Sequence, residues 1–328
     1  MATTITKDKL KATPPARPFF WSYISREEMT RLVSIASSRG AREAAEDVFG
    51  SSPSQKFLRN LLREERGDFG FLLPVPSTGR ILDFGCGWGT TSIALSFRFR
   101  NILGFDATLE NLEFARLRMQ EEQRTNILFV QVEPLENSHL PCAPGSLDCV
   151  ILVGVLEWVA SSTSSGSPEK MQMQFLKDIR GLLKPGGSIY LAIENRFGAP
   201  YWLGRPDPHT YVPFLSLLPR RIANSLMMFL KGCPYRTYTH SHRNLAAILR
   251  KVGFEDLRFY LPVTDYRWPQ TLIPLDKPAA VRCWLRNAFI PRRRIHYLYA
   301  ALLWLMTSFR LAAFLAPDFI VIAKARHD

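Results

Sequence analysis

The residues best suited to chemistry lie close together in the stretch R-I-L-D-F-G-C-G-W-G-T-T, at positions 80–91. A short apolar run there leads to Asp83, and Gly85, Gly87 and Gly89 follow at every second position. Glycine adopts positive φ at little cost and has no side chain to keep a ligand away from the backbone. A glycine turn between a predicted strand and a predicted helix is typical of a nucleotide-type binding site.

A second acid, Asp106, ends the next apolar run, residues 101–105. An acid at a strand end, about 20 residues beyond a glycine turn, is placed to accept hydrogen bonds from ribose hydroxyls. Dinucleotide folds have the spacing G-x-G-x-x-G, whereas this chain has D-F-G-C-G-W-G. The spacing therefore predicts a ribose-containing ligand other than a dinucleotide.

Apolar periodicity places these residues in an alternating series of strands and helices. Further strands are expected at residues 127–131, 147–153, 188–193, 256–261 and 319–324. Helices are expected within residues 19–49 and at 55–66, 90–97, 109–122, 171–183 and 295–316. The carboxyl ends of the strands then form the edge at which α/β proteins bind ligands.

Four segments resemble motifs of the class I S-adenosylmethionine (SAM) methyltransferases, and they occur in that family's order. They are the glycine turn, Asp106, L-P-C-A-P-G-S-L-D-C-V-I-L-V at positions 140–153, and L-L-K-P-G-G-S-I-Y-L-A-I at positions 182–193. The resemblance implies a Rossmann-like α/β fold: a doubly wound seven-stranded sheet with N-terminal helices and a helical insertion before the last strand. It also implies SAM as the cofactor and methyl transfer as the reaction.

The resemblance also assigns cofactor-binding residues. In this family the acid before the first glycine helps to hold the amino end of SAM, and the acid at the next strand end binds the ribose. Glu133 stands where the family has an acid near the adenine amine, although Val132 and Glu133 replace the usual Gly-Asp. The set expected to bind SAM is Asp83, Gly85, Cys86, Gly87, Gly89, Asp106, Ala107, Glu133, Pro134 and Val153.

The C-terminal half resembles a bacterial subgroup of these enzymes that is associated with glycosyltransferases in surface-glycan assembly. The segments that carry this resemblance are E-N-R-F-G, P-D-P-H-T-Y, T-Y-T-H-S-H-R-N-L and F-Y-L-P-V-T-D-Y-R-W-P-Q-T. It implies a glycan, sugar-nucleotide or lipid-linked acceptor, with a sugar hydroxyl as the methylated group, and glycosyltransferases as partners.

Two other functions stay open at this point. The basic C-terminal half suits an RNA or DNA methyltransferase, but no N-P-P-Y or D-P-P-Y motif follows the fourth strand, and no RRM or KH signature is present. A non-catalytic SAM-binding scaffold within a glycan-assembly complex is the third hypothesis. The intact Asp83, Gly85, Gly87 and Asp106 argue against such a loss of activity.

A hydroxyl acceptor needs a base, and the candidates lie beyond the fifth strand. Glu194 ends that strand, where it faces the ligand crevice or braces Arg196. His240 and His242 flank Ser241 at an expected helix start, which favours capping or surface positions for both. His209 lies in a loop rich in Pro, Asp and Tyr, with no evident packing role, and an imidazole's reference pKa suits a base at neutral pH. We therefore select His209 and Glu194 as catalytic candidates.

One further carboxylate, Glu157, follows the fourth strand in G-V-L-E-W-V, the segment that in the family starts the next helix below the reacting centre. Its simpler interpretation is a helix-start carboxylate stabilised by the helix dipole.

Charge and cysteine usage limit the surroundings in which the chain works. Residues 80–200 contain 11 Lys and Arg against 13 Asp and Glu, whereas residues 201–294 contain 16 against 5. The basic excess favours an anionic partner: nucleic acid, a sugar nucleotide, a phospholipid-linked glycan or the membrane surface. The five cysteines form no C-x-x-C pair, which indicates reduced thiols in a cytosolic protein and no metal site.

Residues 1–18 lack a signal-peptide core and are expected to be a mobile leader, followed by an N-terminal helical cap (19–78) and the methyltransferase domain (79–328). Helical additions on the substrate side are expected at about 200–240 and 265–316. The uncharged run at 297–309 is shorter than the roughly 20 residues that span a bilayer. It therefore predicts either a buried or subunit-interface helix, or an interfacial helix that sets the arginines at 292–294 on anionic lipid at the inner face of the membrane.

Overall fold

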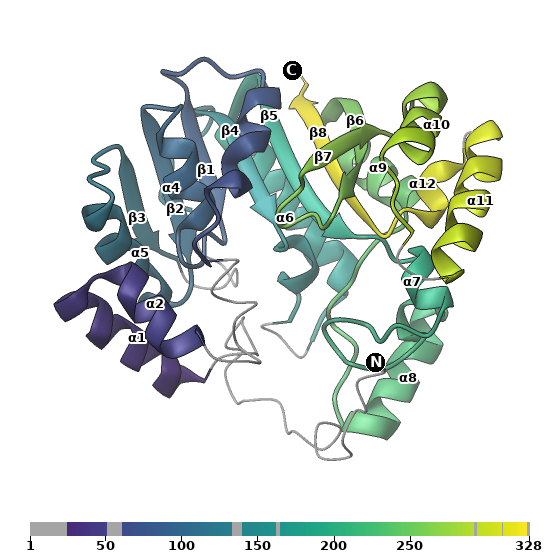
Figure 1. The fold of residues 1–328 in the computed structure, drawn as a ribbon, viewed down its shortest axis with the longest axis horizontal. Coiled ribbons are helices and arrows are strands. Elements are labelled where there is room, and N and C mark those ends of the chain that lie inside the picture. The colour runs from purple at the N-terminus through teal and green to yellow at the C-terminus, as the bar shows by residue number, and fades with distance from the viewer. Residues whose placement is uncertain are drawn as a thin grey trace.

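The computed structural model describes residues 25–50, 61–132, 140–161, 165–291, 294–309 and 311–326. Within them the chain forms one eight-stranded sheet with the order β3-β2-β1-β4-β5-β8-β6-β7 (Figure 1). The strands are β1 Arg80–Phe84, β2 Asn101–Asp106, β3 Ile127–Gln131, β4 Leu147–Val153, β5 Leu183–Glu194, β6 Phe254–Val263, β7 Thr271–Pro274 and β8 Asp318–Ala325. The first five are parallel, whereas β8, β6 and β7 add to β5 in antiparallel fashion.

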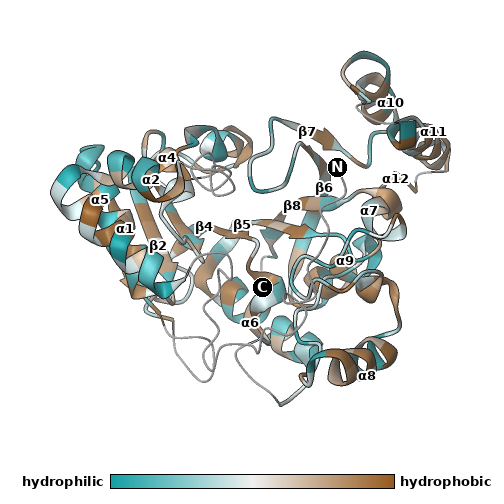
Figure 2. Cartoon of the chain, turned by 60° about the horizontal axis from the view of Figure 1, so that its bottom comes forward, coloured by the Kyte–Doolittle hydropathy of each residue, from teal (hydrophilic) through white to brown (hydrophobic). Residues whose placement is uncertain are grey.

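Both faces of the sheet are covered by helices, because alternate strand residues point to opposite faces and both sets are apolar. On β5, Ile189 and Leu191 pack on the face that holds α6 and α9, while Tyr190 and Ala192 pack on the face that holds η2, α4 and α5. Figure 2 shows the strands as mostly hydrophobic between more mixed helices. The helices after β1 are α4 Thr90–Ser96, α5 Leu109–Glu121, α6 Pro168–Leu182, α7 Ala199–Trp202, α8 Arg220–Lys231, α9 His242–Lys251, α10 Pro278–Asn287, α11 Arg294–Ser308 and α12 Ala312–Leu315, with 3-10 helices at η3 Leu156–Trp158 and η4 Leu215–Leu217.

The N-terminal helices are α1 Arg26–Arg39 and α2 Ala41–Phe49, which lie beside α5 (Figure 1). Ser25 is the N-cap of α1 and forms a capping box with Glu28. Gly40, with φ +92°, ends α1 and separates it from α2. Their apolar residues pack on Trp88 of the glycine turn. The expected helical pattern within 19–49 is therefore confirmed. The helix expected at 55–66 lies partly outside the described residues, which omit 55–60. The expected end of this helix at residue 66 is wrong, because η2 Glu64–Leu72 is a 3-10 helix.

The expected count of seven strands is wrong, because an eighth strand, β7, pairs with β6. The chain turns back after β6, and Thr271 pairs with Val263 in a short hairpin at the sheet edge. β7 has only four residues, ends in one proline and lies two residues beyond another, so its sequence carries little strand signal. The local pattern therefore placed this segment in a helical insertion. β5 also begins earlier than expected, at Leu183, because that residue pairs with Leu147 across a register shift.

The placement of two additions on the substrate side stays a prediction, and the helix expected at 295–316 is not continuous, because α11 ends at Ser308 and α12 begins at Ala312. Residues 200–240 contain α7, η4 and α8, and residues 265–316 contain β7, α10, α11 and α12. Among the described helices, none combines the length and apolar character required to cross a bilayer.

Candidate active site

The glycine turn has the backbone geometry that its composition predicted. Gly85, Gly87 and Gly89 all have positive φ, at +73°, +52° and +73°. A Cβ on Gly85 would lie 2.6 Å from Cγ2 of Val155, and one on Gly89 would lie 2.9 Å from the Cβ of Ala115. These contacts are too short for any side chain, so the turn requires glycine for both its conformation and its close packing.

Asp106 ties the end of β2 to this turn. Its Oδ2 accepts a hydrogen bond from Gly87 N at 2.9 Å, and its Oδ1 accepts from Thr108 N at 2.9 Å and from Asn111 Nδ2 at 3.3 Å. Burial raises the pKa of Asp106, although these hydrogen bonds oppose the shift. The carboxylate therefore holds the turn in place, and Oδ2 retains capacity for a further donor.

Asp83 lies one residue before the end of β1 and is fully buried. Its Oδ2 accepts a hydrogen bond from Ser92 Oγ at 2.6 Å, and burial raises its pKa to about 6. Arg66 of η2 lies near enough for its charge to oppose this rise in the pKa of Asp83, and its Nε has no hydrogen-bond partner. Asp83 and Arg66 thus place one buried carboxylate and one guanidinium near each other.

The remaining residues expected to bind the cofactor differ in position. Ala107 and Val153 lie half-buried at the carboxyl ends of β2 and β4. The side chain of Cys86 packs in the core beneath the turn, so that only its backbone faces the turn. Glu133 and Pro134 lie outside the described residues.

Strand register brings Glu157 and Glu194 to the same edge as the turn. Phe84 of β1 pairs with Leu152 of β4, and Val153 pairs with Ala192 of β5. Glu194 therefore ends β5 just beyond the end of β4, and η3 places Glu157 on the adjoining crossover. Val155, which contacts the glycine turn, connects β4 to η3. Both carboxylates consequently lie beside the predicted cofactor site.

His209 reaches this edge from the loop between α7 and η4. Asp207 shapes the loop, because its Oδ1 accepts hydrogen bonds from His209 N at 2.9 Å and Thr210 N at 3.0 Å. Its Oδ2 accepts from Tyr235 OH at 3.0 Å. The imidazole packs edge-on against Trp158, with ring centroids 4.9 Å apart. The loop therefore does have a packing role, and it fixes the imidazole.

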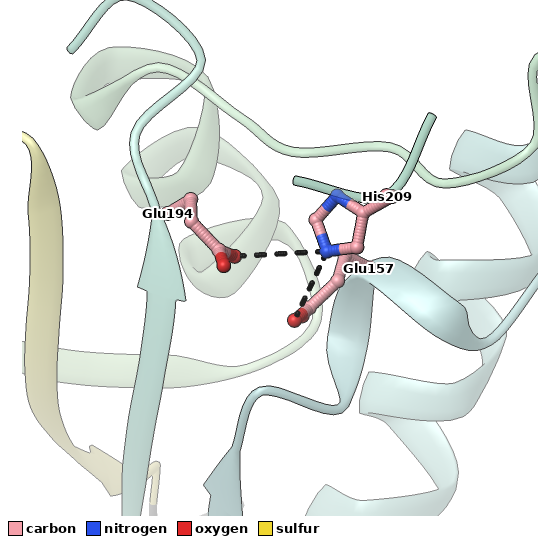
Figure 3. Close-up of side chains that lie close together, drawn as sticks. All are labelled: Glu157, Glu194 and His209. Carbon is pink, nitrogen blue, oxygen red and sulfur yellow. Dashed lines mark ion pairs between the residues drawn. The ribbon is translucent and has the colours of Figure 1, made fainter. Parts of the chain in front are cut away.

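Glu157, Glu194 and His209 converge into one buried cluster, drawn in Figure 3. Nε2 of His209 lies 3.8 Å from Oε1 of Glu157 and 4.0 Å from Oε2 of Glu194, and the three side chains are 4%, 1% and 10% exposed. Tyr266 OH donates to the other Glu194 oxygen at 2.9 Å. Neither oxygen of Glu157, nor Oε2 of Glu194, has a hydrogen-bond partner. Two carboxylates and one imidazole thus face one another, and three of the four carboxylate oxygens have no hydrogen-bond partner.

The electrostatics of the cluster are strongly coupled. Burial and the neighbouring Glu194 raise the pKa of Glu157 to about 7. Burial lowers the pKa of His209, but Asp207, Glu157 and Glu194 raise it by more, so that the net direction is well above the ordinary value. An imidazole among carboxylates is therefore cationic at neutral pH, which corrects the expectation that an ordinary pKa suits His209 to act as a base.

The other catalytic candidates have structural roles. His240 is buried, with Nε2 2.7 Å from Gln172 Oε1 and Nδ1 2.9 Å from Asn244 Nδ2, so its expected surface position is wrong. Burial, then Arg220 and Arg196, lower its pKa to about 3. Ser241 is the N-cap of α9, as expected.

His242 and Arg196 also have structural contacts. His242 packs on Phe259 and Phe319. Arg196 donates to the backbone oxygens of Ser216 and Leu218, so the alternative in which Glu194 only braces Arg196 is wrong.

Sequence reasoning placed Glu157 in the segment below the reacting centre but favoured a helix-start role for it, and gave no role to Asp207, Tyr266 or Arg66. In the structure Glu157 lies in a single 3-10 turn and faces the cluster, so a helix dipole does not account for it. The adjacent D-P-H segment was the available signal for Asp207, because Asp commonly shapes such loops. No local signal marked Tyr266 or Arg66, which arrive from distant segments.

The chain is similar to known methyltransferases. A family model described as a methyltransferase domain matches residues 82–189. A ubiquinone biosynthesis O-methyltransferase of Dechloromonas aromatica (strain RCB) is 30% identical over 179 residues, which cover 50% of this chain and 71% of that protein. The enzyme of the same name from Acinetobacter baylyi is 31% identical over 147 residues, covering 40% of this chain and 57% of its own length.

Solved structures give weaker likenesses. Phosphoethanolamine N-methyltransferase 1 of Haemonchus contortus aligns with a TM-score of 0.48 at 13% identity, covering 95% of this chain and 52% of that chain. A SAM-dependent methyltransferase of Thermotoga maritima aligns with a TM-score of 0.45 at 17% identity, covering 87% and 100%.

Proposed function

Because the chain belongs to the class I SAM-dependent methyltransferase family, we propose that it transfers the methyl group of SAM to a hydroxyl oxygen of a small-molecule or glycan-type acceptor. The chain is a SAM-dependent methyltransferase, and SAM is its cofactor. The relatives' name specifies O-methylation, which supports an oxygen acceptor here. The acceptor's identity is the part that we propose.

The residues at the glycine turn fit SAM. Gly85, Gly87 and Gly89 hold the turn at positive φ with no side chain of their own to cover its backbone, and Asp106 has a carboxylate oxygen with remaining capacity at the end of β2. Asp106 would accept from the ribose hydroxyls, while Asp83 and Arg66 would face the charged ends of the methionine part. When bound, SAM supplies a methyl group on a positively charged sulfur, open to in-line displacement.

The observation that carries the proposal is the cluster of Glu157, Glu194 and His209. A hydroxyl is a poor nucleophile unless its proton is removed as the new bond forms, an effect of about 10² to 10⁴ in rate. An acceptor hydroxyl placed against the cluster would give its proton to these groups as its oxygen bonds to the methyl carbon. Because the groups are coupled, they take up that proton as a unit rather than through one assigned residue.

The test measures methyl transfer to candidate acceptors. The purified protein is incubated with SAM and, in separate reactions, a catechol, a sugar nucleotide, a lipid-linked glycan extract and RNA, and mass spectrometry records the gain of one methyl group. We expect a hydroxyl acceptor to be modified. His209→Gln and Glu194→Gln should each lower turnover by about 10² or more with SAM affinity retained. His242→Gln, whose imidazole lies outside the cluster, should retain normal turnover, and an unaffected His209→Gln would remove the cluster from the reaction.

We also propose that an anionic membrane surface brings the acceptor to this enzyme. The α11 surface consists of exposed apolar side chains on α11, on α12 and in the turn between them: Tyr297, Leu298, Leu302, Leu305, Phe309 and Phe314. Arg282 and Arg286 of α10 stack over Trp304 beside it, and Arg294 begins α11. An apolar surface bordered by arginines suits anionic headgroups.

Vesicle flotation tests the α11 surface. Vesicles that contain phosphatidylglycerol should retain the protein at low salt and release it at high salt, whereas phosphatidylcholine vesicles should not retain it. Leu298→Glu combined with Leu305→Glu should abolish retention, and Phe229→Glu, on the exposed face of α8, should not. Retention that ignores lipid charge would contradict the proposal.

A further inference from the structure

We propose that Glu157, Glu194 and His209 together hold a divalent cation. Each offers one ligand atom, and these atoms all lie within 4.8 Å of one another. The side chains point toward a common centre from η3, the end of β5 and the 203–214 loop (Figure 3). The sequence predicted no metal site, because its argument rested on cysteine spacing, and these three ligands are carboxylate and imidazole groups from separate segments.

The cluster carries an excess of buried negative charge. Three buried carboxylates, those of Glu157, Glu194 and Asp207, surround a single imidazole. Among the described residues, no lysine or arginine lies within ion-pairing distance of any of the three carboxylates. Asp207 is already satisfied by three hydrogen bonds, and among the described residues the imidazole of His209 is the one cationic side chain within ion-pairing distance of Glu157 and Glu194. Buried carboxylates that outnumber their cationic partners are unfavourable unless protons or a metal ion compensate their charge. A divalent ion would neutralise the excess negative charge of the site.

The distances between the imidazole and the two carboxylates also suit a shared metal ion. Two atoms that each lie about 2.1 Å from one ion are at most about 4.2 Å apart. Nε2 of His209 is 3.8 Å from the Glu157 oxygen and 4.0 Å from the Glu194 oxygen, so small side-chain rotations would bring all three into coordination. Both oxygens of Glu157 and Oε2 of Glu194 have no hydrogen bond to break first.

Asp207 supplies the outer support that such sites require. Its Oδ1 lies 3.6 Å from Nδ1 of His209 and accepts a hydrogen bond from the His209 backbone. A carboxylate at Nδ1 favours the tautomer with the proton there, so that Nε2 binds the metal as it releases its own proton to solvent. Tyr266 holds Glu194 through the oxygen that faces away from His209. The ligands are thus oriented before the ion arrives.

One imidazole and two carboxylates favour Mn²⁺ or Zn²⁺ over Ca²⁺, because imidazole is a poor ligand for calcium. Three protein ligands leave coordination positions open for an acceptor oxygen. That role rests on the proposed function: a coordinated hydroxyl is more acidic, and its proton would pass to an uncoordinated carboxylate oxygen of Glu157 or Glu194. Binding of the ion itself requires no acceptor.

Calorimetry and electron paramagnetic resonance test the site directly. Protein freed of tags and stripped with a chelator is titrated with Mn²⁺, Zn²⁺, Mg²⁺ and Ca²⁺ in the absence of acceptor. We expect one Mn²⁺ or Zn²⁺ per chain and a higher melting temperature with the ion. Glu157→Gln and His209→Gln should weaken binding by about 100-fold, and Asp207→Asn by about 10-fold. Glu255→Gln, at a surface carboxylate of β6, should bind as wild type does.

The outcomes separate this inference from the proposed function. If wild-type protein binds SAM and transfers methyl groups after chelation, without binding any of the four ions, the cation site is refuted and the methyltransferase activity stands. If one ion binds and the ligand variants lose it, while no hydroxyl acceptor is methylated, the cation site stands and the proposed acceptor class fails. Ion binding that is equal in Glu157→Gln, His209→Gln and wild type also refutes the site. Circular dichroism confirms that each variant is folded.

Discussion

Replacing Asp106 by alanine tests the predicted ribose contact, because Asp106 has two roles that can be measured separately: it holds the glycine turn, and it is expected to bind the ribose of SAM. Its carboxylate holds Gly87 N and Thr108 N, and it offers further acceptor capacity at the end of β2. A hydrogen bond to a charged group contributes about 1.5 to 3 kcal/mol. Loss of the ribose contact should therefore weaken SAM binding about 10- to 150-fold at 25 °C. The melting temperature should also fall, because two backbone donors lose their acceptor.

Isothermal titration calorimetry with SAM and S-adenosylhomocysteine measures this effect, well below the melting temperature of the variant. Asn111→Ala is the matched control, because it removes a donor to the same carboxylate, at 3.3 Å, and leaves the carboxylate itself. We expect its SAM affinity to change by less than about threefold, since the ligand contact is retained. Wild-type affinity in Asp106→Ala would refute the ribose assignment. An equal loss in both variants would show that Asp106 acts only by holding the turn.

Two further predictions concern stability. In urea unfolding, Gly85→Ala should destabilise the protein by at least about 1 to 2 kcal/mol, because Gly85 has a positive φ and a Cβ there would clash with Val155. Gly181→Ala in α6 should be neutral or stabilising, because the space around Gly181 is open. Equal effects of the two substitutions would refute the packing argument. His240 has a pKa of about 3 in the folded protein and about 6.5 unfolded, so its neutral form stabilises the fold fully above pH 6.5, and this contribution falls as pH drops from 6.5 toward 3. Between pH 7.5 and 5, wild type should therefore lose about 2 kcal/mol more stability than His240→Gln, and parallel losses would contradict a buried neutral imidazole.

The sequence by itself determined the features that depend on neighbouring residues. The positive φ values of the glycine turn follow from glycine, and the strand that ends at Asp106 follows from an apolar run closed by an acid. The expected strands at 127–131 and 147–153 are confirmed to the residue. These features are local, because backbone freedom and hydrophobic periodicity act over a few positions. Glu194 and His209 were also selected locally, as reactive residue types near a strand end and in a loop.

Only the tertiary structure decided what these candidates do together. Sheet register places Glu194 beside Glu157, and a loop that Asp207 shapes brings His209 between them. The charge of the imidazole then depends on carboxylates from three segments, which is why its expected ordinary pKa was wrong. His240 was expected on the surface for the same reason, since its partner Gln172 comes from α6. Burial and pairwise charge are properties of side chains that meet in space, and no window of the sequence contains both members of such a pair.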